Sequence, residues 1–153
     1  MSDETYDAVW HKALTLLGRR EYSAYELQAR LVRYDFNEAL ISEVITALQD
    51  KGWQSDERFT EMLVRTRYQQ GKGPNRIRHE LGQKGVDDAL IEAYVDDHDD
   101  AWFESAISAL QKKLRGHSLA DKHFKMKCLR YLYQQGFTKD HSDYAINSLQ
   151  SDD

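Results

Sequence analysis

Apolar residues recur along the chain at intervals of three and four, the spacing of helices that bury one face. Residues that favour helix starts and stops separate these apolar segments, and the pattern predicts nine helices. The first spans about residues 4–20, the fifth 74–84 and the eighth 119–134. The others are expected to begin near Ser23, Asn37, Ser55, Asp87, Asp100 and Thr138. Inward positions are expected at Val9, Ala13, Leu14 and Leu17 in the first helix and at Tyr144, Ala145, Ile146 and Leu149 in the ninth.

The sharpest turn signal is Gly71-Lys72-Gly73-Pro74, which contains the only proline of the chain. Pro74 suits the first position of a helix, where its missing N–H has no partner to lose and its φ is already helical. Ile77 and Leu81 follow four residues apart, and Gly85 is a candidate left-handed cap. The segment 56–86 therefore predicts two helices joined by a tight corner.

The apolar pattern repeats with a period of about 50 residues. Shifting the chain by 50 and then by 51 aligns Leu27 with Ile77 and Cys128, and Leu31 with Leu81 and Leu132. The third copy is weaker, because Leu90 and Ile91 align with His141 and Ser142. Repeats of this length predict a stacked array. We therefore expect an all-α protein of three tandem three-helix repeats, near 1–52, 53–99 and 100–153, that forms an elongated array with few contacts between repeats.

Composition agrees with a helical domain and narrows its setting. The chain has 153 residues, of which 41% are hydrophobic and 31% charged, enough to bury a core. A single cysteine, Cys128, excludes an internal disulfide and fits a reducing compartment. The first residues are acidic rather than basic, and no apolar run approaches the roughly 18 residues of a membrane span. We expect a soluble, cytoplasmic monomer.

Charge is distributed unevenly in this chain, whose net charge is −5. Residues 65–84 hold six basic residues and one acid, residues 85–111 hold no Lys or Arg, and residues 112–130 are basic again. A basic face could contact phosphates or an acidic protein groove, or it could simply be solvated. The candidate partner- or DNA-binding residues are Arg65, Arg67, Lys72, Arg76, Arg78, Lys84, Lys122, Lys125, Lys127 and Arg130.

No catalytic, cofactor or metal motif emerges from the sequence. The acidic run 96–100 lacks the ligand spacing and glycine of a calcium loop and suits a solvated linker. Cys128, with His117 and His123 upstream, matches no zinc pattern and is better explained as a core residue. The corner at 71–74 lacks the spacing of a phosphate-binding loop. Tyrosines among the basic residues could stack on nucleic-acid bases, although core packing is the commoner role: Tyr68, Tyr131 and Tyr133.

Several motifs together resemble the signature of the RecX regulatory proteins. In order along the chain they are Arg58-Phe59, Arg65, Gly71-Lys72-Gly73-Pro74, Ile77-Arg78, Glu80-Leu81 and Lys84-Gly85-Val86. The resemblance covers most of the chain and is strongest in the middle repeat. It implies a bacterial, cytosolic protein of tandem three-helix repeats that binds the RecA recombinase filament and touches DNA. It also implies inhibition of strand exchange, ATP hydrolysis and the co-protease activity that triggers the SOS response, without catalysis or cofactors.

Two alternatives differ from this reading in what the chain contacts. The first is a module that binds single-stranded nucleic acid directly, with an affinity that falls steeply with salt. The net negative charge disfavours strong binding of this kind, so we expect DNA contact to be weak or made through the filament. The second alternative is that the protein is an enzyme. The sequence does not support this, because it shows no nucleophile–base pair, no set of metal ligands and no phosphate-binding loop.

Overall fold

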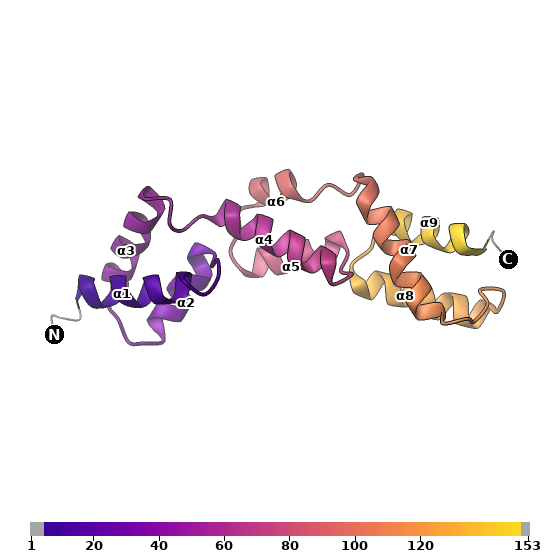
Figure 1. Ribbon diagram of the computed structural model, residues 1–153, viewed down its shortest axis with the longest axis horizontal. Coiled ribbons are helices and arrows are strands. Elements are labelled where there is room, and N and C mark those ends of the chain that lie inside the picture. The colour runs from indigo at the N-terminus through magenta and orange to yellow at the C-terminus, as the bar shows by residue number, and fades with distance from the viewer. Residues whose placement is uncertain (1–4, 151–153) are drawn as a thin grey trace. The chain divides into compact units, whose positions relative to one another are not determined.

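The computed structural model describes residues 5–150, which contain nine helices and no strand (Figure 1). This confirms the all-α prediction; Glu4, where the first helix was expected to begin, lies outside the described residues. The helices are α1 (Tyr6–Leu17), α2 (Ala24–Val32), α3 (Glu38–Asp50), α4 (Asp56–Gln69), α5 (Pro74–Gln83), α6 (Asp88–Tyr94), α7 (Asp100–Leu114), α8 (Lys122–Gln135) and α9 (Lys139–Gln150).

Side-chain caps set most of the helix starts. The Ser23 hydroxyl accepts a hydrogen bond from the Glu26 N–H at 3.1 Å, and Asn37 accepts from the Ala39 N–H at 2.8 Å. Asp121 caps α8, so this helix begins at Lys122 rather than near Leu119. Leu119 lies instead in the preceding connection, where its side chain is buried. The Asp121 carboxylate accepts the His123 N–H at 2.9 Å, which fixes the helix start at this position.

The chain folds into two compact units. The first unit contains residues up to 62 together with 81–91, and the second contains 63–80 together with 92 onward. The first unit therefore holds α1, α2 and α3, whereas α7, α8 and α9 belong to the second. The helices α4, α5 and α6 contribute residues to both.

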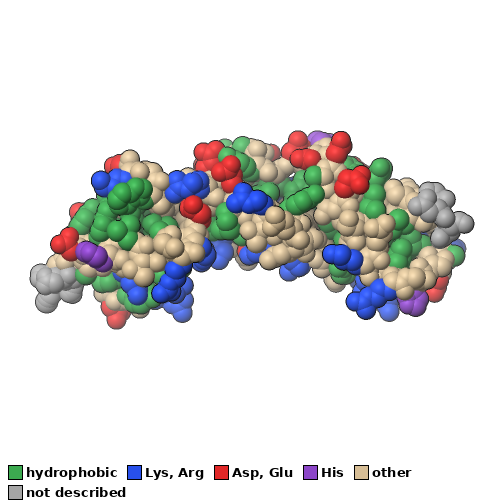
Figure 2. Space-filling view, viewed as in Figure 1, with side chains coloured by type: hydrophobic (Ala, Val, Ile, Leu, Met, Phe, Trp, Pro, Cys, Tyr) green, Lys and Arg blue, Asp and Glu red, His purple; other side chains and the backbone are tan. Residues whose placement is uncertain are grey.

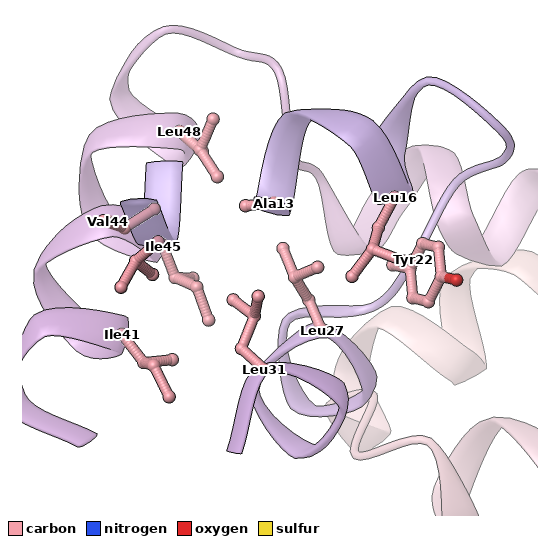
Figure 3. Packing of buried hydrophobic residues seen from close by; sticks show 10 residues of the cluster. Ala13, Leu16, Tyr22, Leu27, Leu31, Ile41, Val44, Ile45 and Leu48 are labelled. Carbon is pink, nitrogen blue, oxygen red and sulfur yellow. The ribbon is translucent and has the colours of Figure 1, made fainter. Parts of the chain in front are cut away.

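In the first unit, α1, α2 and α3 enclose a small apolar core (Figure 3). Val9, Ala13 and Leu16 form the fully buried stripe of α1, at spacings of four and three. The expected positions Leu14 and Leu17 are only partly buried and pack at the edge of this core. At the C-terminal end of α1 the inward residue is therefore Leu16 and not the expected Leu17. The Leu16 side chain lies on the face of α1 that points toward Leu27.

In the second unit, α7 and α9 pack along each other, with α8 beside them (Figure 1). The buried face of α9 consists of His141, Ser142, Ala145 and Ile146. Tyr144, which was expected to face inward, is 47% exposed, so that prediction was wrong. The reason is His141: its Nε2 lies 2.7 Å from the Asp97 carbonyl oxygen, and its Nδ1 accepts the Thr138 N–H at 3.2 Å. These hydrogen bonds let a polar ring occupy the inner face.

Burial follows the 50-residue repeat. The aligned residues Leu27, Ile77 and Cys128 are all fully buried, as are Leu31, Leu81 and Leu132. Ile41, Ile91 and Ser142 are also buried, so the third copy keeps the pattern even where its residues are polar. The equivalent turns match as well, because Asp35, Gly85 and Gly136 all have positive φ.

The contacts between successive three-helix repeats are themselves repeated. In the first unit, the Ser23 hydroxyl at the start of α2 donates to the Lys84 carbonyl oxygen at 2.8 Å. In the second unit, Gly73, the equivalent of Ser23, donates its N–H to the Gln135 carbonyl oxygen at 2.6 Å. The approach is close, since a Cβ on Gly73 would lie 2.4 Å from the Gly136 carbonyl carbon. The Gly-x-Gly-Pro corner thus docks the start of α5 onto the end of α8.

Candidate partner-binding surface

Three of the six candidate cations at residues 65–84 are held in ion pairs. Arg67 binds Glu80 in a bidentate geometry, with N–O distances of 2.8 and 2.7 Å, and this pairing raises the pKa of Arg67. Arg78 pairs with Asp97, and the Lys84 ammonium lies 3.1 Å from a Glu26 carboxylate oxygen. Each of these three side chains therefore joins two segments of one unit, in addition to any role with a partner.

The other three cations of this stretch are more open. Lys72 lies 3.4 Å from the Gln135 side-chain oxygen, and an Arg76 guanidinium nitrogen lies 3.5 Å from the Gln134 carbonyl oxygen, both at the limit of hydrogen bonding. Arg65 is exposed on α4 and has no polar partner within residues 5–150. Arg65 and Arg76 are thus the residues of this face best placed to meet a partner.

The second basic segment forms a groove between the C-terminal part of α7 and one face of α8. The groove has a volume of about 800 Å³. Its lining consists of Lys112, Lys113, Arg115, His117, Phe124, Lys127, Arg130, Tyr131 and Gln134. Figure 2 shows Lys and Arg side chains gathered at this end of the second unit, whereas Asp and Glu gather near the start of α7. No Asp or Glu is among the residues that line the groove.

The turn between α7 and α8 carries one of these cations in an unusual backbone conformation. Arg115 ends α7 with φ 46° and ψ 43°, and Gly116 follows with φ 86°. For a residue with a Cβ, the left-handed conformation costs roughly 1–2 kcal/mol of conformational energy relative to the right-handed one. The tight reversal brings the basic end of α7 next to the basic face of α8.

A smaller hollow of about 280 Å³ adjoins this groove and shares Lys112 and Tyr131 with it. Tyr68 lines the smaller hollow and packs edge-on against Trp102, with ring centroids 5.6 Å apart. Tyr133, the third tyrosine of interest, is 46% exposed and lines neither hollow.

Sequence reasoning found only part of this groove. Lys127 and Arg130 line it, but Lys122 and Lys125 project from other faces of α8 and do not. Tyr131, considered from the sequence as a stacking residue, lines it too. The lining residues that were not among the candidates are Lys112, Lys113, Arg115, His117, Phe124 and Gln134. The sequence could have indicated the α8 side of the groove, because positions 124, 127, 131 and 134 share one face of a helix at i, i+3, i+7 and i+10. The contribution of α7 could not be inferred without knowing how the turn at 115–121 folds.

The cysteine of the chain lies in a setting that disfavours reactivity. Cys128 is fully buried, and burial raises the pKa of its thiol, which disfavours the reactive thiolate. Within residues 5–150, no group of three or more His, Cys, Asp or Glu side chains is arranged to hold a metal ion. In the same range, no helix combines the length and apolarity that a membrane crossing requires.

These observations define a helical-repeat protein with a cationic surface groove. Family models describe three successive parts of the chain: "RecX, first three-helix domain" matches residues 10–48, the second domain matches 55–95 and the third matches 99–146. The chain belongs to the RecX family, and its fold is three tandem three-helix domains. The exact boundaries at residues 52 and 99 stay predictions.

Relatives match nearly the whole chain. The regulatory protein RecX of Mannheimia succiniciproducens is 39% identical over 148 residues, which cover 92% of this chain and 94% of that protein. The regulatory protein RecX of Haemophilus influenzae strain PittEE is 36% identical over 141 residues, covering 91% and 93%. The crystal structure of RecX from Lactobacillus salivarius superposes with a TM-score of 0.85 at 26% identity, covering 99% of each chain. The chain is therefore a member of a family of regulatory proteins.

Proposed function

We propose that this protein is a non-enzymatic regulator that binds the RecA–DNA filament and inhibits strand exchange, ATP hydrolysis and co-protease activity. It would thereby modulate DNA repair and the SOS response in the cytoplasm. The observation that carries the proposal is the match of all three RecX domains in order, together with relatives described as regulatory proteins over most of their length.

The surface chemistry supports a binding role. Arg65 and Arg76 are exposed on α4 and α5, and the groove between α7 and α8 adds five further Lys and Arg residues. Several exposed aromatic side chains, including Tyr25 at 58% and Trp53 at 48%, add contact area of the kind that is enriched at protein interfaces. A partner that presents acidic or phosphate groups would be attracted and oriented by such a surface.

The direct test measures RecA activity on single-stranded DNA as this protein is added. We expect ATP hydrolysis and strand exchange to slow at or below one molecule of regulator per RecA protomer. If both rates are unchanged at a large excess of folded protein, the proposed function is wrong.

A paired substitution tests the contribution of the α4–α5 face. Arg65→Glu with Arg76→Glu reverses two exposed charges, and surface changes of this kind usually alter stability by no more than about 0.5 kcal/mol. We expect weaker inhibition at equal protein concentration. Arg19→Glu with Arg33→Glu is the matched control, because both residues are exposed and lie outside the proposed surface. Arg78 is left intact, since its reversal would also break the pair with Asp97.

A further inference from the structure

We propose that the groove between α7 and α8 binds a single strand of nucleic acid, with its cations on the phosphates and Tyr131 as a stacking surface. This inference rests on the proposed function only for the source of the strand, the DNA of the filament. The site itself follows from the chemistry of the groove and is tested on nucleic acid without RecA.

The charge of the groove is the first observation. Lys112, Lys113, Arg115, Lys127 and Arg130 line it, and none of them forms an ion pair with an Asp or Glu in residues 5–150. This contrasts with Arg67, Arg78 and Lys84, whose charges are matched within the protein. Cations without an internal ion pair remain available to displace the counterions of a phosphate backbone.

The aromatic lining is the second observation, and it favours a single strand over other polyanions. Tyr131 lies half-buried in the groove with the Lys113 ammonium 4.9 Å from its ring centroid. His117 and Phe124 contact each other, with ring centroids 5.3 Å apart, on the same lining. Unpaired bases stack on such rings, whereas a duplex keeps its bases stacked on each other and an acidic peptide offers none.

The size and continuation of the groove also suit a strand. Its volume of about 800 Å³ lies within the roughly 300–1,000 Å³ typical of ligand sites. It adjoins the smaller hollow through Lys112 and Tyr131, and that hollow carries Tyr68. The smaller hollow adds an aromatic ring but no cation beyond Lys112, and Glu104 lines it, so the phosphate contacts are expected in the larger groove.

The net charge of the chain limits the affinity. A total of −5 repels a polyanion at long range, although the field close to the groove is positive. Binding is therefore expected to be strongest at low ionic strength. If all five cations contact phosphates, the logarithm of the binding constant should fall with the logarithm of salt concentration with a slope of about −3.5.

The test measures fluorescence anisotropy of a labelled oligothymidylate at several salt concentrations, with the full chain and no RecA. Lys127→Glu with Arg130→Glu reverses two groove charges, and Tyr131→Leu removes the stacking ring while keeping an apolar side chain. Arg19→Glu with Arg33→Glu gives the same change in total charge outside the groove and serves as the control. Circular dichroism and thermal unfolding establish that each variant is folded.

We expect the groove reversal to weaken binding at least tenfold and to make the salt slope shallower by about 1.4, the share of two phosphate contacts. Tyr131→Leu should weaken binding of the oligonucleotide but not of poly-glutamate, and the control should change affinity much less. The proposal is overturned if the groove and control reversals act equally, if duplex DNA binds more tightly than the single strand, or if Tyr131→Leu has no effect. It is also overturned if the folded wild-type protein fails to bind the strand at low salt, an outcome that leaves inhibition of RecA to be judged by its own assay.

Discussion

At the scale of single residues, Glu26 shows how polar side chains fix the contact between the first and second repeats. Its carboxylate lies 2.9 Å from Arg20 of its own repeat and 3.1 Å from Lys84 at the end of α5. Partial burial alone would raise the pKa of Glu26, but the hydrogen bonds from Arg20 and Lys84 outweigh burial and leave this pKa below its ordinary value. The folded protein therefore favours the ionised form of Glu26 more than the unfolded chain does.

This difference predicts a specific dependence of stability on pH. Because the folded pKa is lowered, the stabilisation by Glu26 is fully present above the unfolded pKa of about 4.3 and is lost as pH falls through the folded value. We expect Glu26→Gln to destabilise the protein by roughly 1 kcal/mol at pH 7, since the pair is only partly buried. The deficit relative to wild type should shrink as pH falls below about 4.

Urea unfolding at a series of pH values measures this difference. Glu43→Gln is the control, because Glu43 is exposed on α3 and has no ion pair within residues 5–150. The account of Glu26 is incorrect if its deficit is the same at pH 7 and pH 3.5, or if the control shows an equal deficit.

At the scale of elements, local sequence determined most helices but not every face or end. Ser23, Asn37 and Thr138 were identified as caps because short polar side chains accept N–H groups wherever the helix lies. The inner face of α9 was not predictable, because His141 is tolerated there only through the carbonyl oxygen of Asp97, 44 residues away. Sequence periodicity carries no information on such a distant partner.

The same reason explains which site residues the sequence could identify. The clustering of cations within residues 65–84 and 112–130 is visible in the sequence. Which of them meet an acid is not, since Glu80 and Asp97 reach Arg67 and Arg78 only after the helices pack. Tertiary structure thus separates cations that stabilise the fold from those that remain open in the α7–α8 groove.

The docking of α5 on α8 yields a prediction about glycine. Gly73→Ala places a Cβ 2.4 Å from the Gly136 carbonyl carbon, and both segments are backbone that cannot rotate away. We expect a loss of about 1–3 kcal/mol, the usual cost of overpacking. Gly82→Ala is the matched control on α5: no atom lies within 4 Å of its Cβ position, so alanine should stabilise the helix by about 0.5–1 kcal/mol.

Urea unfolding of the two variants gives this comparison directly. Opposite signs for Gly73→Ala and Gly82→Ala would support a packing role for the Gly-x-Gly-Pro corner. Equal, small effects would show that the corner needs glycine for neither packing nor docking.

At the scale of the whole molecule, the repeat explains how one set of local rules builds three domains. Each three-helix domain buries its own stripe, and hydrogen bonds at the ends of helices join successive domains. The start of α2 contacts the end of α5 within the first unit, and the start of α5 contacts the end of α8 within the second. Proteins in which repeats contact only their neighbours extend along one direction rather than around one centre.

An elongated monomer stays a prediction from the sequence repeat. A compact protein of this length would have a radius of gyration of about 15 Å, so an array should give a clearly larger value in small-angle X-ray scattering. A radius near 15 Å would contradict the array, because three domains could reach it only by packing around a shared core.

Sedimentation velocity tests the monomer and should report a mass of 17.9 kDa that does not change with concentration. A mass that rises with concentration would instead contradict the monomer, and repeating the measurement with Arg65→Glu/Arg76→Glu would show whether the α4–α5 face is the contact between copies.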